Sequence, residues 1–178
     1  NALAAAAIAN ALDIGVSRIA TALSNHQSIS KWRMELSEAN GLTLINDSYN
    51  ANPESMSAAL RTLALISQET GGVSWAFLGK MQELGESSAT EHAAIGRLAT
   101  EIGIDHLVAI GNREYLDDLA VNDGGGTGAV HYFEDKESAL ALVEHLSPGD
   151  VVLVKASRAG EFNLLADAIA EKLRGDNA

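Results

Sequence analysis

The chain has no cysteine among its 178 residues. This absence excludes a structural disulfide and any chemistry that depends on a thiolate. A domain of this length buries about 70% of its unfolded surface on folding, so it needs neither a disulfide nor a metal to be stable. The lack of cysteine agrees with a cytoplasmic location, which we expect for this protein.

Positive charge is also scarce, since 12 Lys and Arg residues stand against 24 Asp and Glu, giving a net charge of −12. Such a surface repels the phosphates of nucleic acids and of anionic lipids, so we expect neither nucleic acid nor a membrane as partner. An anionic ligand must instead be bound by a few cations at particular positions. The candidates are Arg33, Lys80, Lys155 and Arg158.

Long apolar runs and phosphate-binding loops are missing as well. The apolar stretch 2–8 is far shorter than the roughly 20 residues of a membrane span, and no basic segment precedes it as in a signal peptide. No Gly-x-x-x-x-Gly-Lys-Ser/Thr occurs, and the glycine-rich stretch 124–128 precedes an expected strand instead of following one. The five histidines show no metal-ligand spacing. The start at Asn1, inside an alanine-rich helical pattern, is expected of a piece cut from a longer protein.

What the sequence does contain is an alternation of strands and helices. Two short helices are expected over residues 1–25, and a β-hairpin with the turn Asn40-Gly41 joins 33–37 to 42–45. Further strands are expected at 73–78, 106–110, 129–133 and 151–154. Helices are expected at 53–68, 88–102, 113–121, 136–146 and 162–173. This order predicts an α/β, Rossmann-like three-layer fold with a mostly parallel sheet of about six strands and one antiparallel strand from the hairpin.

Polar side chains cluster where the strand 42–45 ends and a helix begins at Pro53. In open α/β sheets, ligands bind at the carboxyl ends of the strands. Asp47 could accept hydrogen bonds from both ribose hydroxyls, although a turn or helix cap is the alternative for such a residue. Tyr49, Asn50 and Asn52 could hold a small peptide or line a phosphate site, and Asn52 could equally cap the helix.

Cations lie at two related positions. Arg33, on the expected antiparallel strand, could reach a carboxylate, phosphate or ribose, or could be an exposed charge that protects a sheet edge. Lys155, Ser157 and Arg158 directly follow the buried strand 151–154. Two cations and a hydroxyl at that place suit a carboxylate ligand, and two ordinary surface cations are the alternative.

Five segments together resemble one family, the UDP-N-acetylmuramoyl-tripeptide–D-alanyl-D-alanine ligases (MurF) of the Mur ligases. The most specific is Asp47-Ser48-Tyr49-Asn50-Ala51-Asn52-Pro53-Glu54-Ser55. The others, in the same order as in the family, are 1–5, 33–35, 78–85 and 148–158. Lys80 departs from the pattern, since the family commonly has an aspartate there.

The resemblance implies a function that the residues alone do not give. It identifies residues 1–28 as the helical tail of a central ATP-binding domain and 29–178 as the carboxy-terminal domain of the ligase. It implies ATP, Mg²⁺, D-alanyl-D-alanine and UDP-N-acetylmuramoyl-tripeptide as ligands, with the metal ligands on the missing domains and no catalysis by this chain alone. Asn1, Arg33 and Asp47 would then contact nucleotide, and Tyr49, Asn50, Asn52, Lys155, Ser157 and Arg158 substrate. Another Mur or folylpolyglutamate ligase, or a non-catalytic nucleotide- or partner-binding module, is the alternative.

Overall fold

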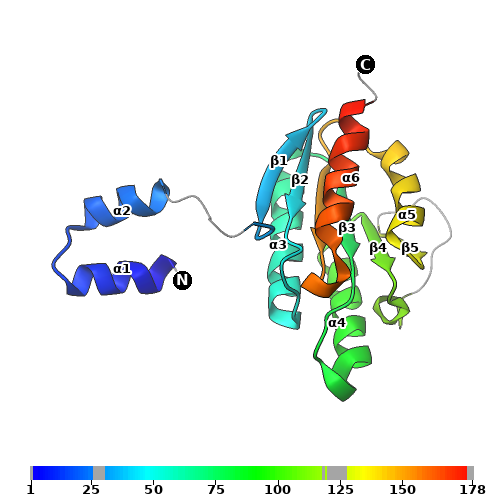
Figure 1. Ribbon diagram of the computed structural model, residues 1–178, viewed down its shortest axis with the longest axis horizontal. Helices are drawn as coiled ribbons and strands as arrows, with labels where there is room; N and C mark the ends of the chain where they lie inside the picture. Colours follow the sequence, from blue (N-terminus) through cyan, green and yellow to red (C-terminus); the bar gives the residue numbers. More distant parts are fainter. Residues whose placement is uncertain (1, 26–30, 118, 120–127, 176–178) are drawn as a thin grey trace. The chain divides into compact units, whose positions relative to one another are not determined.

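The computed structural model describes residues 2–25, 31–117, 119 and 128–175. The chain divides into two compact units, Asn1–Lys31 and Trp32–Ala178. The first unit holds two helices, α1 (Ala2–Ala11) and α2 (Val16–Ser24), which meet at the break around Asp13 (Figure 1). Neither helix buries a residue, and Leu3 and Val16 are 87% and 72% exposed. An apolar pair of this kind cannot form a core alone.

The second unit is built on a six-stranded sheet with the order β1-β2-β6-β3-β4-β5. Its strands are β1 (Glu35–Ala39), β2 (Leu42–Asn46), β3 (Ser74–Leu78), β4 (His106–Ile110), β5 (Ala129–Phe133) and β6 (Val151–Lys155). Among the strands that the structure describes, only the pairing of β1 with β2 is antiparallel, and the remaining pairs are parallel. The predicted α/β fold and its mostly parallel six-stranded sheet are therefore confirmed.

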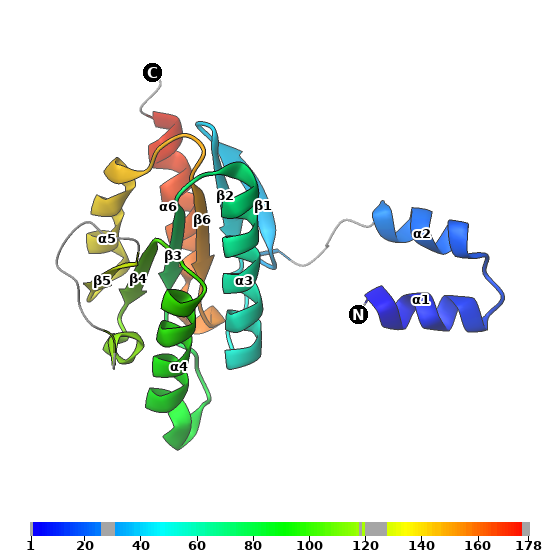
Figure 2. The ribbon, with the colours of Figure 1, turned by 180° about the vertical axis from the view of Figure 1, so that it is seen from behind.

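Helices cover both faces of this sheet (Figures 1 and 2). On one face, α3 (Pro53–Thr70) and α4 (Ser88–Glu101) pack against Ala76 and Leu78 of β3. On the other face, α6 (Phe162–Gly175) and α5 (Lys136–Ala139) pack against Trp75 and Phe77 of the same strand. Successive residues of a strand point to opposite faces, so the fully buried β3 serves two cores and gives three layers.

The hairpin forms as the sequence predicts. Asn40 and Gly41 adopt φ angles of 51° and 75°, the pair of positive values that a type I′ turn requires. Ala39 then pairs with Leu42, and the register continues to Glu35 opposite Asn46. Strand β1 begins only at Glu35, so Arg33 precedes the strand on which it was expected.

Two expected helices are shorter than predicted. Of the described residues in the segment 113–121, only those of the 3-10 turn η2 (Arg113–Leu116) are helical. Tyr115 in this turn is fully buried against α4, where a Cβ on Gly96 would lie 1.8 Å from the Tyr115 carbonyl oxygen. The segment 136–146 changes after α5 into the 3-10 helix η3 (Leu140–His145). Three residues per turn align Leu140, Val143 and Leu146, all of which contact the core. Within the described residues, no helix is both long and apolar enough to cross a membrane.

Candidate functional site

The loops that follow β2 and β6 meet at the carboxyl end of the sheet. Lys155, the last residue of β6, places its Nζ 2.6 Å from Asp47 Oδ2 and donates a second hydrogen bond to the Asn50 carbonyl at 2.9 Å. Ser157 Oγ donates to the Ala51 carbonyl at 3.3 Å. The two polar segments that the sequence singles out, 47–52 and 155–158, are thus joined by direct contacts.

The Lys155–Asp47 ion pair is largely buried. The Lys155 side chain is only 1% exposed and that of Asp47 14%. Burial lowers the pKa of Lys155, against the hydrogen bond and charge of Asp47, which favour the ammonium form. The charge of Lys155 is thus neutralised by Asp47. The sequence instead predicts that Lys155 faces a carboxylate ligand, and in this respect the prediction is wrong. Asp47 Oδ1 also accepts from the Met34 amide at 3.0 Å.

Two arginines stack on one tyrosine beside this ion pair. Arg33 Cζ lies 4.1 Å from the centroid of the Tyr49 ring, and Arg158 Cζ lies 5.4 Å from it. Both arginines are exposed, and the ring is half-buried. Arg33 comes from a turn in which Trp32 and Met34 have φ angles of 61° and 47°. The Tyr49 amide fixes this turn by donating to the Trp32 carbonyl at 3.0 Å. Two guanidinium groups held by one ring form a place where an anion can bind.

The remaining predicted residues mainly order the backbone. Asn52 is the N-cap of α3. Its side chain accepts from the Ser55 amide at 2.8 Å while Ser55 Oγ accepts from the Asn52 amide, a complete capping box. Asn50 Oδ1 accepts from the Ala51 amide at 2.9 Å. The cap that was the alternative for Asn52 is thus what the structure contains. Asn1 and residues 124–127 of the glycine-rich stretch lie outside the described residues.

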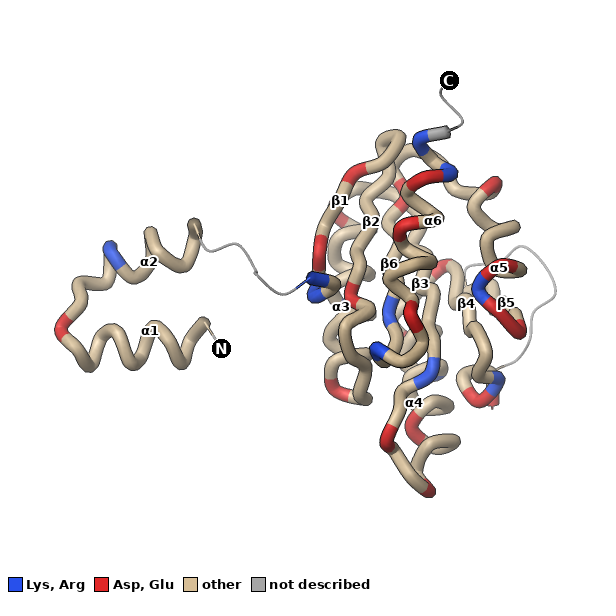
Figure 3. The backbone as a smooth tube through the Cα atoms, viewed as in Figure 1, with Lys and Arg blue, Asp and Glu red and all other residues tan. Residues whose placement is uncertain are grey.

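A cavity of about 300 Å³ opens beside these loops, where β3, β4 and β5 end. Its lining is partly charged and partly apolar: Lys80, Gln82, Ile110, Gly111, Glu134, Asp135, Lys136, Gly160 and Phe162. Figure 3 shows basic segments beside the ends of β3 and β6 at this edge. Lys80 is among the cations that the sequence suggests, whereas Lys136 is not. Lys136 lies three residues beyond the end of β5, at the start of α5, so its proximity to a strand end is a weaker signal than that of Lys155.

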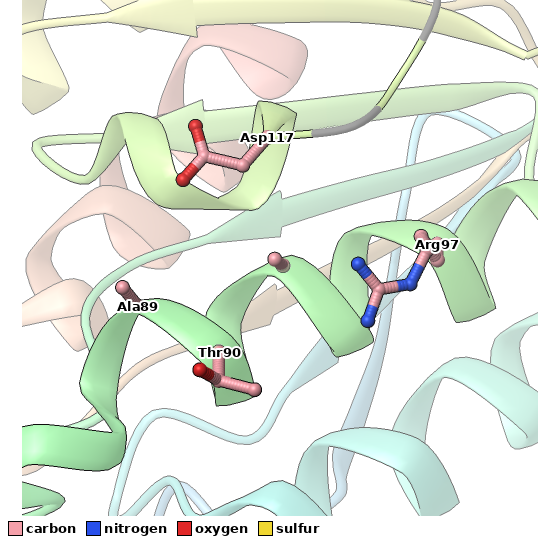
Figure 4. A pocket seen from close by; sticks show the side chains of 5 residues that line it. Ala89, Thr90, Arg97 and Asp117 are labelled. Carbon is pink, nitrogen blue, oxygen red and sulfur yellow. The ribbon is translucent and has the colours of Figure 1, made fainter.

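A larger hollow of about 510 Å³ lies between the outer side of α4 and η2 (Figure 4). Its lining consists of Ala89, Thr90, Ala93, Arg97 and Asp117. None of these follows a strand end directly, and none belongs to the two joined loops. We therefore assign the smaller cavity as the candidate site, since ligands in α/β sheets bind where strands end. Among the described residues, no group of three or more His, Asp or Glu side chains could hold a metal ion.

Comparison with known proteins gives consistent matches. Residues 32–158 match the family described as Mur ligase, glutamate ligase domain. The UDP-N-acetylmuramoyl-tripeptide–D-alanyl-D-alanine ligase of Mycobacterium tuberculosis is 39% identical over 187 residues, which cover 95% of this chain and 37% of that protein.

Solved structures agree with the sequence match. A crystal structure of MurF from Acinetobacter baumannii is similar with a TM-score of 0.78 and 30% identity, covering 96% of this chain and 36% of that one. MurF ligase from Thermotoga maritima, solved in complex with ADP, has the same fold with a TM-score of 0.72 and 23% identity, over 97% of this chain and 37% of that one. This chain thus spans little more than a third of the length of its relatives.

Proposed function

The chain belongs to the Mur ligase family, and on that premise we propose that it is the carboxy-terminal lid of an ATP-dependent ligase that adds D-alanyl-D-alanine to UDP-N-acetylmuramoyl-tripeptide. The match to MurF proteins over 95% of the chain supports this member over other Mur or folylpolyglutamate ligases. Because the chain spans 37% of that relative, the proposal assigns the phosphate loop, the metal ligands and the tripeptide site to other domains. Residues 1–28 are proposed as the tail of the central domain.

The nucleotide half of the site is proposed to consist of Arg33 and Asp47 together with Tyr49 and Arg158. The resemblance assigns Tyr49 and Arg158 to the substrate, but the Tyr49 ring that Arg158 shares with Arg33 favours the nucleotide half. A carboxylate offers about four acceptor positions, and Lys155 and the Met34 amide use two of those on Asp47. Its remaining 14% exposure leaves room for a ribose hydroxyl. The two guanidinium groups on Tyr49 suit phosphate oxygens. When bound, ATP supplies the phosphoryl group that activates the tripeptide carboxylate for attack by the dipeptide amine.

The dipeptide half is proposed to be the cavity at the ends of β3 to β5. D-alanyl-D-alanine carries one ammonium, one carboxylate and two methyl groups. The cavity offers cations from Lys80 and Lys136, carboxylates from Glu134 and Asp135, and the apolar ring of Phe162. Opposite charges at separate positions would orient the dipeptide so that its amine faces the nucleotide half.

One observation carries this proposal, the 2.6 Å contact between Lys155 Nζ and Asp47 Oδ2 that joins the two strand-end loops. Asn50, Asn52 and Ser157 then act by shaping the wall between the two halves, through the backbone contacts described above. A lid built in this way would close over both ligands and exclude water from the activated carboxylate.

The test is a ligase assay on the full-length protein that contains this chain. We expect ATP-dependent attachment of D-alanyl-D-alanine to UDP-N-acetylmuramoyl-tripeptide, and no turnover by the 178-residue chain alone. Arg33→Gln should raise KM for ATP, and Lys80→Gln should raise KM for the dipeptide, each by roughly tenfold, as for a lost charge-assisted hydrogen bond. Arg61→Gln, at an exposed position of α3, is the matched control.

Two results would contradict the proposal. A full-length protein that binds nucleotide but attaches no dipeptide would favour the non-catalytic binding module. Equal effects of Arg33→Gln and Lys80→Gln on both KM values would contradict the assignment of separate nucleotide and dipeptide halves.

A further inference from the structure

The segment Gly79–Gln82, which carries Lys80 into the cavity, is held by side chains from three other parts of the fold. His92 Nε2, from α4, accepts from the Met81 amide at 2.9 Å. The Tyr115 hydroxyl, from η2, donates to the Gly79 carbonyl at 2.7 Å. Ser157 Oγ accepts from the Gln82 amide at 2.9 Å. Such contacts fix the backbone on both sides of Lys80.

Packing restricts the same segment. A Cβ on Gly79 would lie 2.2 Å from the Phe162 ring and 2.8 Å from Ala156 Cβ, so the backbone lies directly against the cavity wall. The Ser157 amide also donates to the Lys80 carbonyl at 3.2 Å. The backbone of Lys80 is thus held in place, and this restricts the direction in which its side chain points.

The hydrogen bonds of His92 define its tautomer. Its Nδ1 lies 2.7 Å from the Ser88 carbonyl oxygen, which can only accept, so Nδ1 must carry a proton. Its Nε2 faces the Met81 amide, which can only donate, so Nε2 must carry a lone pair. The contacts are therefore satisfied only by the neutral ring protonated at Nδ1.

Charged groups around the His92 ring have opposing effects on its protonation. Glu114 Oε2 lies 3.3 Å from Nδ1 and favours protonation, as does the more distant Glu91, whereas Lys80 opposes it. Tyr115 packs edge-on at 4.9 Å between ring centroids. The ring itself is 0% exposed, and this burial outweighs the carboxylates and lowers the pKa of His92 below its ordinary value.

We propose that His92 is a positioning residue for the amine substrate, which holds the Lys80 loop in its binding shape as long as its ring is neutral. The proposal rests on the assignment of the cavity to D-alanyl-D-alanine. Protonation would turn Nε2 from an acceptor into a donor that faces another donor, the Met81 amide. The loop would then lose the hydrogen bond from the Met81 amide to His92, and the Lys80 side chain would no longer be held in one direction.

The first test follows the Met81 amide by NMR in the 178-residue chain. His92→Phe removes the acceptor and should lower the protection of the Met81 amide against hydrogen exchange by roughly tenfold, as for the loss of one buried hydrogen bond. His92→Gln can place an amide oxygen near Nε2 and should keep the protection within about threefold of wild type. Unchanged protection in His92→Phe would overturn the proposal.

The second test is a pH titration of the wild type, with His92→Gln as its control. In the wild type, the Met81 amide resonance should move together with the His92 ring resonances as the pH is lowered below about 6.5. In His92→Gln the Met81 resonance should not titrate. If the chemical shift of the Met81 amide in the wild type stays constant while His92 titrates, the proposal is contradicted, even if His92→Phe is unfolded.

The third test separates this proposal from the proposed function. In the full-length ligase, His92→Phe should raise KM for D-alanyl-D-alanine and leave KM for ATP unchanged, and His92→Gln should restore the wild-type value. An equal rise in both KM values would indicate a general structural defect and refute positioning. If the wild type attaches no dipeptide, the proposed function fails, while the two NMR tests still decide whether His92 holds the loop.

Discussion

Removal of the Asp47 carboxylate should destabilise the protein more than removal of its partner Lys155. In Asp47→Asn, Lys155 keeps its charge at 1% exposure and retains only carbonyl and amide acceptors. In Lys155→Met, a side chain of similar volume fills the buried space. The carboxylate of Asp47 then stays bound to the Met34 amide and has 14% of its surface in water.

The expected losses of stability follow from this difference between a fully buried lysine and a partly exposed carboxylate. Breaking a buried ion pair by removing one partner costs about 3 to 5 kcal/mol, and because Asp47 is partly exposed we expect the lower value, about 3 kcal/mol, for Asp47→Asn. We expect about 1 kcal/mol for Lys155→Met. For a domain of this size, about 3 kcal/mol lowers Tm by roughly 6 to 12 °C. The double variant should be close to wild type, because no unpaired charge remains.

The assay is thermal and urea unfolding of the four proteins, repeated at pH 7 and pH 9. In Asp47→Asn the loss of the carboxylate lowers the pKa of Lys155 further, so the folded state binds fewer protons than the unfolded state, whose lysines titrate near 10.4. The free energy of unfolding of this variant therefore rises with pH, and its gap to wild type should narrow from pH 7 to pH 9. A larger loss in Lys155→Met than in Asp47→Asn would refute the reasoning.

Three further predictions concern other parts of the fold. Asn52→Ala should lower the free energy of unfolding by about 1 kcal/mol through loss of the capping box of α3, whereas Asn52→Asp should preserve it in urea unfolding. Gly79→Ala should lower Tm and weaken dipeptide binding by calorimetry, because its Cβ would displace the Phe162 ring, and an unchanged Tm would contradict the packing. Burial lowers the pKa of three histidines, so the folded state binds fewer protons than the unfolded state below about pH 6.5, and the free energy of unfolding should fall as the pH drops from 6.5 to 5. A flat pH profile would contradict this burial of His92, His106 and His131.

The architecture could be predicted because its signals are local. The run Val151–Val154 is apolar at every position, which indicates a strand covered on both faces, and Asn40-Gly41 specifies one turn type. The two 3-10 helices could not be predicted, because their geometry depends on distant partners such as Gly96 of α4 against Tyr115. Here tertiary packing overrides the local helical pattern.

For the candidate site, the meeting of the two strand-end loops was predictable, but the contacts between them were not. Strand ends at Asp47 and Lys155 show in the sequence where polar groups gather, and topology brings parallel strand ends to one edge. The sequence does not show that Lys155 neutralises Asp47 across 108 positions of chain or that Arg33 and Arg158 share the ring of Tyr49. Both depend on the order β2-β6-β3, in which the last strand is inserted between earlier ones.

The central claim is that one edge of the sheet holds two neighbouring half-sites, one for nucleotide and one for the dipeptide. NMR shift mapping on the 178-residue chain tests it directly, with ADP and D-alanyl-D-alanine added separately at millimolar concentration. We predict that ADP shifts the amide resonances around Arg33, Asp47 and Tyr49, and that the dipeptide shifts those around Lys80 and Phe162. Dipeptide shifts confined to the hollow between α4 and η2, around Thr90 and Asp117, would contradict the account.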